Sequence, residues 1–312
     1  MPRILAASRD GLRELDDRAV PGAVHHAGRA VTTVVQGGKQ LWAIVDGSEV
    51  WHTAEGDGWT HLGDLEHHQG TCLAFMEDDV LVGSSEARLF RIVGEGIEPV
   101  AAFDRAEGRS TWYTPWGGPP DTRSISEWDE AVYVNVHVGG ILRTEDGGET
   151  WAPTIDIDAD VHQVTTAEGM VLAACAGGLA TSTDRGGTWT FRTEGLEAAY
   201  SRAVTVCGDS VLVSASRGPR GGHAAVYRGD LAGGGLERCR TGLPQWFDDN
   251  IDSYCLDAHP AGSFVAFGTS DGRLFASEDA GLSWAEFASG LPPVQRVLVL
   301  PRMSRYGSVV AG

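Results

Sequence analysis

The sequence predicts an all-β fold, a seven-bladed β-propeller in which each blade is a four-stranded antiparallel sheet. Three observations lead to this fold class. Glycine is abundant, with 42 residues in a chain of 312, and glycine clusters recur beside short apolar runs, as expected for short strands joined by tight turns. One eight-residue motif occurs three times. A four-strand plan also recurs at intervals of roughly 38 to 54 residues, the length of a propeller blade.

The repeated motif reads (Ser/Thr)-x-Asp-x-Gly-x-(Ser/Thr)-Trp and spans residues 144–151, 182–189 and 277–284. A shortened, degenerate copy occupies residues 53–59. An Asp close to a Gly is typical of a tight turn, because the carboxylate can accept backbone N–H groups and the Gly can adopt a positive φ. The Trp that ends the motif can pack its ring between sheets. We therefore interpret all three copies as structural hairpin turns.

This motif resembles the Asp box, also called the BNR repeat, of sialidases, sortilin-type receptors and a photosystem assembly factor. The resemblance implies a β-propeller. Sialidases of this type also have six blades, an arginine triad that grips the sugar carboxylate, a Tyr–Glu nucleophile pair and an Arg-Ile-Pro motif. Here seven blades are predicted, Arg91-Ile-Val replaces Arg-Ile-Pro, and neither Tyr113 nor Tyr254 has an evident Glu partner. The resemblance therefore covers the fold only, because one fold can host many functions.

The four-strand plan is clearest around the second motif, where strands are expected at 161–166, 170–175, 179–182 and 188–192. Six complete copies follow one another along the chain, and the seventh blade is split between the chain ends. Residues 294–300 supply its first strand, and residues 11–15 supply another. Either 308–311 or 4–7 is its second strand. Closing the ring in this way removes open sheet edges, so residues 1–312 are expected to form one domain.

The composition is strongly acidic, with a formal net charge of −19 and a pI near 4.8. Such a surface repels nucleic acids and anionic membranes, so neither is an expected partner. Lys39 is the only lysine, so arginine supplies nearly every cation. The five cysteines are scattered singly, which argues against a disulfide framework. No apolar run has the length of a signal-peptide core or a membrane span. We expect a soluble, cytoplasmic protein.

Polar residues begin the strands that are expected to line the channel. In the propellers that this chain resembles, the innermost strand of each blade starts at the top mouth of the channel. The seven start positions hold four Arg, two Gln and one Asp, namely Arg29, Gln69, Arg123, Gln163, Arg202, Asp252 and Arg296. A guanidinium group fits a carboxylate or a phosphate, so we expect this mouth to bind a small anionic molecule or to catalyse its reaction. The alternative is that these arginines pair with acidic neighbours.

Three histidines are expected near the same mouth. His137 follows the second strand of the third blade, while His68 and His162 lie beside the starts of two innermost strands. His137 and His162 are candidates for a general acid and a general base. In an alternative interpretation, His68, His137 and His162 together bind one divalent transition metal, such as zinc, copper or iron. The acidic stretch 156–160 reads as a solvated turn.

Tryptophans lie in two long loops that are expected at the same end of the propeller. Trp112 and Trp116 precede the third blade, and Trp246 precedes the sixth. Exposed aromatic side chains beside arginines can form the walls of a small-molecule pocket. In the alternatives, these rings plug the channel, or they form the contact patch of a protein-interaction scaffold without catalysis. The scaffold alternative predicts that histidine substitutions leave function unchanged.

Overall fold

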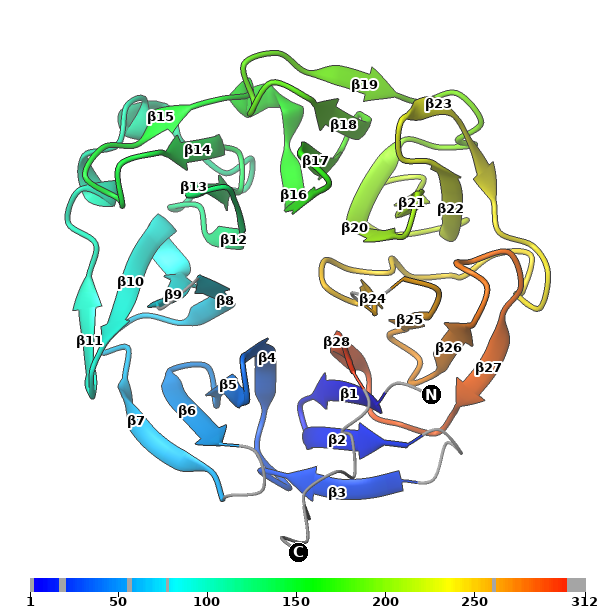
Figure 1. The fold of residues 1–312 in the computed structure, drawn as a ribbon, viewed down its shortest axis with the longest axis horizontal. Helices are drawn as coiled ribbons and strands as arrows, with labels where there is room; N and C mark the ends of the chain where they lie inside the picture. Colours follow the sequence, from blue (N-terminus) through cyan, green and yellow to red (C-terminus); the bar gives the residue numbers. More distant parts are fainter. Residues whose placement is uncertain (1–2, 17–20, 55–57, 77–78, 260–261, 302–312) are drawn as a thin grey trace, which may run out of the picture.

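The computed structural model describes residues 3–16, 21–54, 58–76, 79–259 and 262–301. Within these ranges, 28 strands form seven four-stranded antiparallel sheets, arranged as blades in a ring around a central axis (Figure 1). The predicted seven-bladed β-propeller is therefore confirmed. Four short 3₁₀ segments lie in the loops: η1 (Ser85–Ala87), η2 (Phe103–Arg105), η3 (Arg109–Thr111) and η4 (Ile157–Ala159). None of the helices in the described ranges has the length and hydropathy needed to cross a membrane.

Each blade runs from an innermost strand at the axis to an outermost strand at the rim (Figure 1). Blade 1 contains β4 (Val31–Gly37), β5 (Gln40–Val45), β6 (Glu49–Ala54) and β7 (Thr60–Asp64). Blade 2 contains β8 (Gly70–Met76), β9 (Asp79–Ser84), β10 (Arg88–Val93) and β11 (Gly96–Pro99). Blade 3 contains β12 (Thr122–Trp128), β13 (Ala131–Val136), β14 (Gly140–Thr144) and β15 (Ala152–Pro153).

The remaining blades follow the same order. Blade 4 contains β16 (Val161–Ala167), β17 (Met170–Cys175), β18 (Gly178–Ser182) and β19 (Thr190–Arg192). Blade 5 contains β20 (Tyr200–Cys207), β21 (Ser210–Ser216), β22 (Ala225–Asp230) and β23 (Gly233–Arg238). Blade 6 contains β24 (Leu256–Ala258), β25 (Val265–Gly268), β26 (Leu274–Ser277) and β27 (Ala285–Ala288). Blade 7 contains β28 (Val294–Leu300), β1 (Arg3–Ser8), β2 (Gly11–Leu15) and β3 (Pro21–His25).

Blade 7 closes the ring by pairing the two ends of the chain. Strand β28 lies antiparallel to β1, so that Leu298 pairs with Leu5 and Val297 pairs with Ala6. Residues 4–8 are therefore part of the second strand of this blade. The other candidate for that position, 308–311, lies outside the described residues. The pairing completes the seventh four-stranded blade from both ends of the chain and so closes the ring.

The hydrophobic core lies between neighbouring blades. All seven residues of β21 are buried, because other blades cover both faces of this second strand. One core cluster joins Val226 of blade 5 to Phe267 and Phe275 of blade 6, and the rings of Phe267 and Phe275 stack with centroids 5.1 Å apart. Burial of this kind removes apolar surface from water along each blade interface. It therefore stabilises the circular arrangement of blades, whose innermost strands carry the channel residues.

The three repeated turns are held by the same set of hydrogen bonds. In the second copy, the Ser182 hydroxyl donates to Asp184 at 2.8 Å, and the backbone N–H of Thr188 donates to the same carboxylate at 2.8 Å. The copies at 144–151 and 277–284 make equivalent bonds. The indole N–H of Trp151 and of Trp284 donates to a glycine carbonyl in its own turn. This local geometry agrees with a structural role for the motif.

Candidate functional site

The innermost strands of six blades carry a β-bulge close to their first residues. In blade 3, Thr122 and Ser124 pair with consecutive residues of β13, so Arg123 is the extra residue. His162 has the same position in blade 4. The other residues that fall within these bulges include Thr32, Thr71, Arg202 and Gln295. A bulge redirects a side chain, and bulges are common beside active sites.

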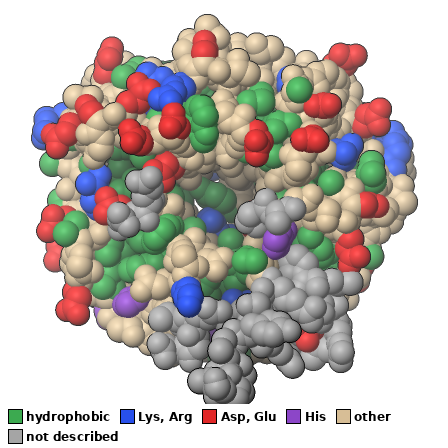
Figure 2. Space-filling model, viewed as in Figure 1, with side chains coloured by type: hydrophobic (Ala, Val, Ile, Leu, Met, Phe, Trp, Pro, Cys, Tyr) green, Lys and Arg blue, Asp and Glu red, His purple; other side chains and the backbone are tan. Residues whose placement is uncertain are grey.

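Five of these residues line one cavity of about 370 Å³ at the channel, which we name the channel cavity. Its charged side chains belong to three arginines and two aspartates: Asp121, Arg123, Arg202, Asp252 and Arg296. Figure 2 shows the ring hollowed at its centre, with Lys or Arg side chains inside the hollow and many acidic side chains around it. The cavity is therefore a local concentration of positive charge in a protein whose net charge is −19.

Two of the three arginines have protein partners. The Arg202 guanidinium forms an ion pair with Asp252, with Nε and Oδ1 2.8 Å apart. Arg296 is 6% exposed, donates from Nη1 to the Thr33 hydroxyl at 2.9 Å, and lies over the Tyr254 ring with Cζ 4.0 Å from the centroid. Across the described ranges, no hydrogen bond or ion pair engages the Arg123 guanidinium.

The surroundings of Arg123 disfavour its own positive charge. Burial lowers the pKa of Arg123, and repulsion by Arg202 lowers it further, against the opposing attraction of Asp121 and Asp160. A lowered pKa in a cation means that the charged form is less stable at this position than in water. A bound anion would remove that penalty, because it supplies the missing counter-charge and hydrogen-bond acceptors.

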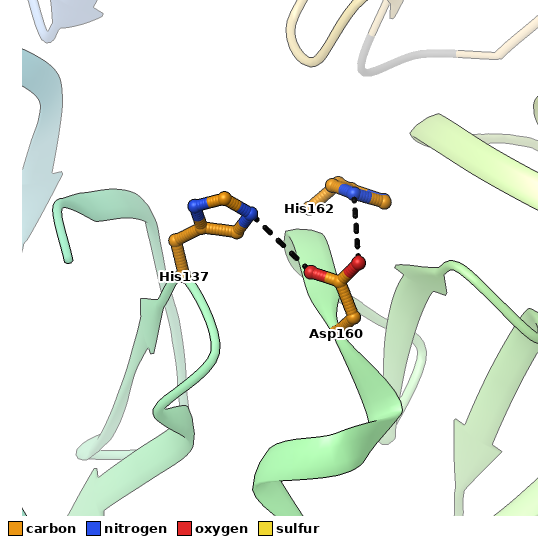
Figure 3. Close-up of side chains that lie close together, drawn as sticks. All are labelled: His137, Asp160 and His162. Atoms are coloured by element: carbon orange, nitrogen blue, oxygen red, sulfur yellow. Dashed lines mark ion pairs between the residues drawn. The ribbon is translucent and has the colours of Figure 1, made fainter. Parts of the chain in front are cut away.

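His137, Asp160 and His162 form a second group of polar residues (Figure 3). His137 directly follows β13, Asp160 directly precedes β16, and His162 is the second residue of β16. The His137 Nε2 atom lies 3.3 Å from Asp160 Oδ1, and the His162 Nε2 atom lies 3.8 Å from Asp160 Oδ2. The contact with His137 lowers the pKa of Asp160, against the opposing effect of burial. Blades 3 and 4 therefore bring three polar side chains to one point.

His162 is held in one tautomer. Its side chain is fully buried, and its Nδ1 atom lies 2.7 Å from the Ser201 carbonyl oxygen. A carbonyl only accepts hydrogen bonds, so Nδ1 carries the proton and donates it. Burial lowers the pKa of His162 to about 4 and outweighs the attraction of Asp160, while the positive field of Arg202 lowers it further. The ring is therefore neutral at physiological pH, and Nε2 presents a lone pair toward Asp160.

The two groups share their supporting residues. The Ser253 hydroxyl, which lines the channel cavity, lies 3.0 Å from the carbonyl oxygens of both His162 and Arg202. The Tyr200 ring lies 4.7 Å from the His162 ring and 5.7 Å from the Arg202 Cζ atom. These contacts make the histidine group and the channel cavity one continuous polar region.

Three of the seven predicted start positions lie outside the channel cavity. Arg29 pairs instead with Asp46 and Glu49, with N–O distances of 2.8 and 2.7 Å. Gln69 is exposed at the start of β8. The Gln163 side chain is buried and held by two hydrogen bonds: it donates to the Val204 carbonyl at 2.9 Å and accepts from the Tyr254 N–H at 2.8 Å.

The third predicted metal ligand lies elsewhere. The His68 ring packs 5.6 Å from the ring of Phe90 and is not part of the group that His137 and His162 form. Asp160 has the third position instead. The expectation of a solvated turn at 156–160 therefore missed this carboxylate. The available signal was its position two residues before His162 at the start of an innermost strand.

The three tryptophans of the long loops have different environments. Trp112 packs against Phe103, with ring centroids 5.9 Å apart, and beneath the guanidinium of Arg109. Trp246 is sandwiched between the His223 ring, at 4.8 Å, and the Arg238 guanidinium, at 4.0 Å. Trp116 is 70% exposed, and its ring lies 5.0 Å from the His137 ring. Only Trp116 of the three thus lies against the histidine group.

Sequence reasoning also missed the smaller polar residues of the cavity. Thr32, Thr71 and Gln295 line it because they fall within the bulges of their strands, as Arg123 does. An alignment of strand starts does not reveal a bulge, since the extra residue shifts which side chains face the channel.

No protein-family model matches the chain, and no curated protein sequence matches it. Solved structures are similar in fold. A GH74 xyloglucanase from Xanthomonas campestris aligns with a TM-score of 0.70 and 17% identity, over 92% of this chain and 52% of that chain. This chain thus spans about half of that enzyme.

Two further structures match most of both chains. YCF48 from Cyanidioschyzon merolae has a TM-score of 0.59 at 14% identity, covering 84% of this chain and 86% of that chain. The computationally designed protein Ika8 has a TM-score of 0.59 at 13% identity, covering 96% and 92%. At these identities the likeness defines the class, a β-propeller, and function must be argued from the site.

Proposed function

We propose that the channel cavity binds a small anionic molecule, a carboxylate or a phosphate, through Arg123, Arg202 and Arg296. One observation carries this proposal: Arg123 lies in a cavity of about 370 Å³ beside two other arginines, without a hydrogen bond or ion pair to any residue described. A cavity of this volume fits a small ligand. Planar guanidinium groups offer the paired donors that carboxylates and phosphates accept.

Binding is favoured over proton-transfer catalysis at this site. His162 is a weak base there, because burial lowers its pKa to about 4, whereas an efficient general base has a pKa near the working pH. A scaffold function carried by an aromatic patch is also less favoured, since Trp112 and Trp246 are packed against other side chains. In the channel cavity, by contrast, the positive charges of three arginines outnumber the negative charges of two aspartates, which favours an anionic ligand.

The repeated turns and the cysteines support two further proposals, one on the motif and one on the cellular compartment. We infer that the repeated turns are Asp boxes, which their shared hydrogen bonds support. We also propose a reducing, cytoplasmic environment, supported by five cysteines that are all buried and unpaired.

A screen of small carboxylates and inorganic phosphate by thermal shift tests the binding proposal. Three forms are compared: wild type, Arg123→Gln, and the control Arg105→Gln, whose arginine is exposed on η2. We expect at least one anion to stabilise the wild type and the control by several degrees at saturation. Arg123→Gln should bind that anion about 10- to 100-fold more weakly, because a charge-assisted hydrogen bond contributes about 1.5–3 kcal/mol.

The same variant separates a binding role from a structural one. Since burial and Arg202 disfavour the charge of Arg123, Arg123→Gln should be at least as stable as wild type when no anion is present. A marked loss of stability would identify Arg123 as a structural residue and contradict the proposal. Equal anion affinity in wild type and Arg123→Gln would contradict it as well.

A further inference from the structure

The group formed by His137, Asp160 and His162 contains polar atoms that the protein leaves without partners. His162 Nε2 is buried and has no hydrogen-bond partner among the described residues, and the buried Asp160 Oδ1 has only the ion-pair contact of 3.3 Å with His137 Nε2. The Nε2 lone pair of His162 faces the carboxylate across 3.8 Å. Two electron-rich atoms that face each other in a buried position are unfavourable unless a cation or a donor lies between them.

We propose that His137, Asp160 and His162 bind one divalent transition metal ion, for which Zn²⁺ is the natural probe. The three candidate ligand atoms lie within 4.8 Å of one another. A tetrahedral zinc ion with bonds of about 2.0–2.2 Å holds its ligand atoms roughly 3.3 to 3.5 Å apart. Each histidine lies near this spacing from the carboxylate, His137 Nε2 at 3.3 Å from Oδ1 and His162 Nε2 at 3.8 Å from Oδ2, so a small side-chain movement brings one ligand atom of each residue around a single ion.

The support around His162 is that of a metal ligand. Histidines that bind metals usually donate their second ring N–H to a carbonyl or carboxylate, which fixes the tautomer and the ring orientation. The His162 Nδ1–H donates to the Ser201 carbonyl at 2.7 Å and leaves Nε2 free for a metal. The ring has little freedom to turn, because its side chain is fully buried and the Tyr200 ring packs 4.7 Å away.

The choice of ligands favours zinc-like ions over calcium and magnesium. Two imidazole nitrogens and one carboxylate suit zinc, copper, iron or nickel, whereas calcium and magnesium prefer all-oxygen sites. Three protein ligands also leave at least one coordination position open. The metal site uses none of the three arginines, so its ligands differ from those of the proposed anion site.

Zinc titration of the full-length, chelator-treated protein tests this inference. We expect wild type to bind one equivalent of Zn²⁺ by calorimetry, and the same stoichiometry to appear by elemental analysis after gel filtration. Excess Ca²⁺ or Mg²⁺ should not displace it. Co²⁺ in the same site should give the visible absorption of a low-coordinate complex.

Asp160→Asn is the most informative variant. Asp160 has a φ of 47° and a ψ of 69°, and Asn tolerates this left-handed conformation well. The variant should keep the melting temperature of the metal-free protein and bind Zn²⁺ at least about tenfold more weakly. If it does not fold, His137→Gln replaces it with the same expected loss. His68→Ala is the matched histidine control and should bind like wild type.

Three results would overturn the inference. The first is a wild type that takes up no stoichiometric zinc. The second is equal zinc affinity in wild type and in a folded Asp160→Asn or His137→Gln protein. The third is an equal loss in His68→Ala, which would place the zinc at another histidine. None of these results bears on anion binding by Arg123, so the two proposals fail separately.

Discussion

The three repeated turns offer an internal comparison of what a buried tryptophan contributes to stability. Trp284 and Trp151 are each 5% exposed. Trp189 occupies the same motif position but is only partly buried, and its indole N–H donates to the Thr154 carbonyl at 2.7 Å instead of to its own turn. We predict that Trp284→Ala destabilises the fold much more than Trp189→Ala, although the sequence motif is the same.

The expected magnitude follows from burial. An aromatic side chain buries about 150–250 Å², which at about 25 cal/mol per Å² corresponds to about 4–6 kcal/mol. Measured Trp→Ala changes in protein cores cost about 3–5 kcal/mol. Trp284 also packs edge-on against Phe267, with centroids 5.0 Å apart. We therefore expect a loss of about 3–5 kcal/mol for Trp284→Ala, and of about 2 kcal/mol or less for Trp189→Ala.

Thermal and urea unfolding followed by far-UV circular dichroism would measure these differences. A loss of about 3–5 kcal/mol lowers the melting temperature by roughly 5–8 °C in a protein of this size. Trp151→Ala serves as the replicate, because Trp151 is as buried as Trp284. Equal losses for Trp189→Ala and Trp284→Ala would contradict this prediction, since the motif alone, and not burial, would then set the contribution of the tryptophan to stability.

Two further predictions concern buried titratable groups. Burial raises the pKa of Asp257 from its ordinary range to about 6, so the folded protein binds the proton more tightly and its stability falls as pH rises from about 4 to 6. Asp257→Asn should therefore stabilise the protein above pH 6, by at most about 3 kcal/mol, with no gain below pH 4 in pH-dependent urea unfolding. Burial also raises the pKa of Cys72 and Cys175 to about 12, and all five cysteines are buried. A thiol reagent at pH 8 should label none of them rapidly in the native protein and all five in denaturant; fast native labelling would contradict this assignment.

The fold could be predicted from the sequence because the apolar strand runs, the repeated turn motif and the spacing of the copies all indicate the same propeller blade. The expected strand 170–175 coincides with β17, and the turn motif fixes where the third strand of a blade ends. The sequence did not decide between two candidates for the second strand of blade 7, because residues 4–7 and 308–311 are both short apolar runs of the kind that form buried strands.

The site was less predictable, since it depends on bulges and on partners from other blades. Arg123 and Arg202 lie in the channel cavity as their strand positions suggest, but Arg29 is engaged by Asp46 and Glu49. A sequence does not show which arginine meets an acidic neighbour across a turn. Asp160 was overlooked for the same reason: its contact with His137 joins two blades.

Anion binding by Arg123 in the channel cavity can be observed directly. The most direct measurement is a crystal structure of the wild type grown with the anion that gives the largest thermal shift, or with inorganic phosphate. We predict density for that anion between Arg123 and at least one of Arg202 and Arg296, within hydrogen-bond distance of the Arg123 guanidinium. A channel cavity that holds only water at saturating anion, with the anion bound elsewhere, would contradict it.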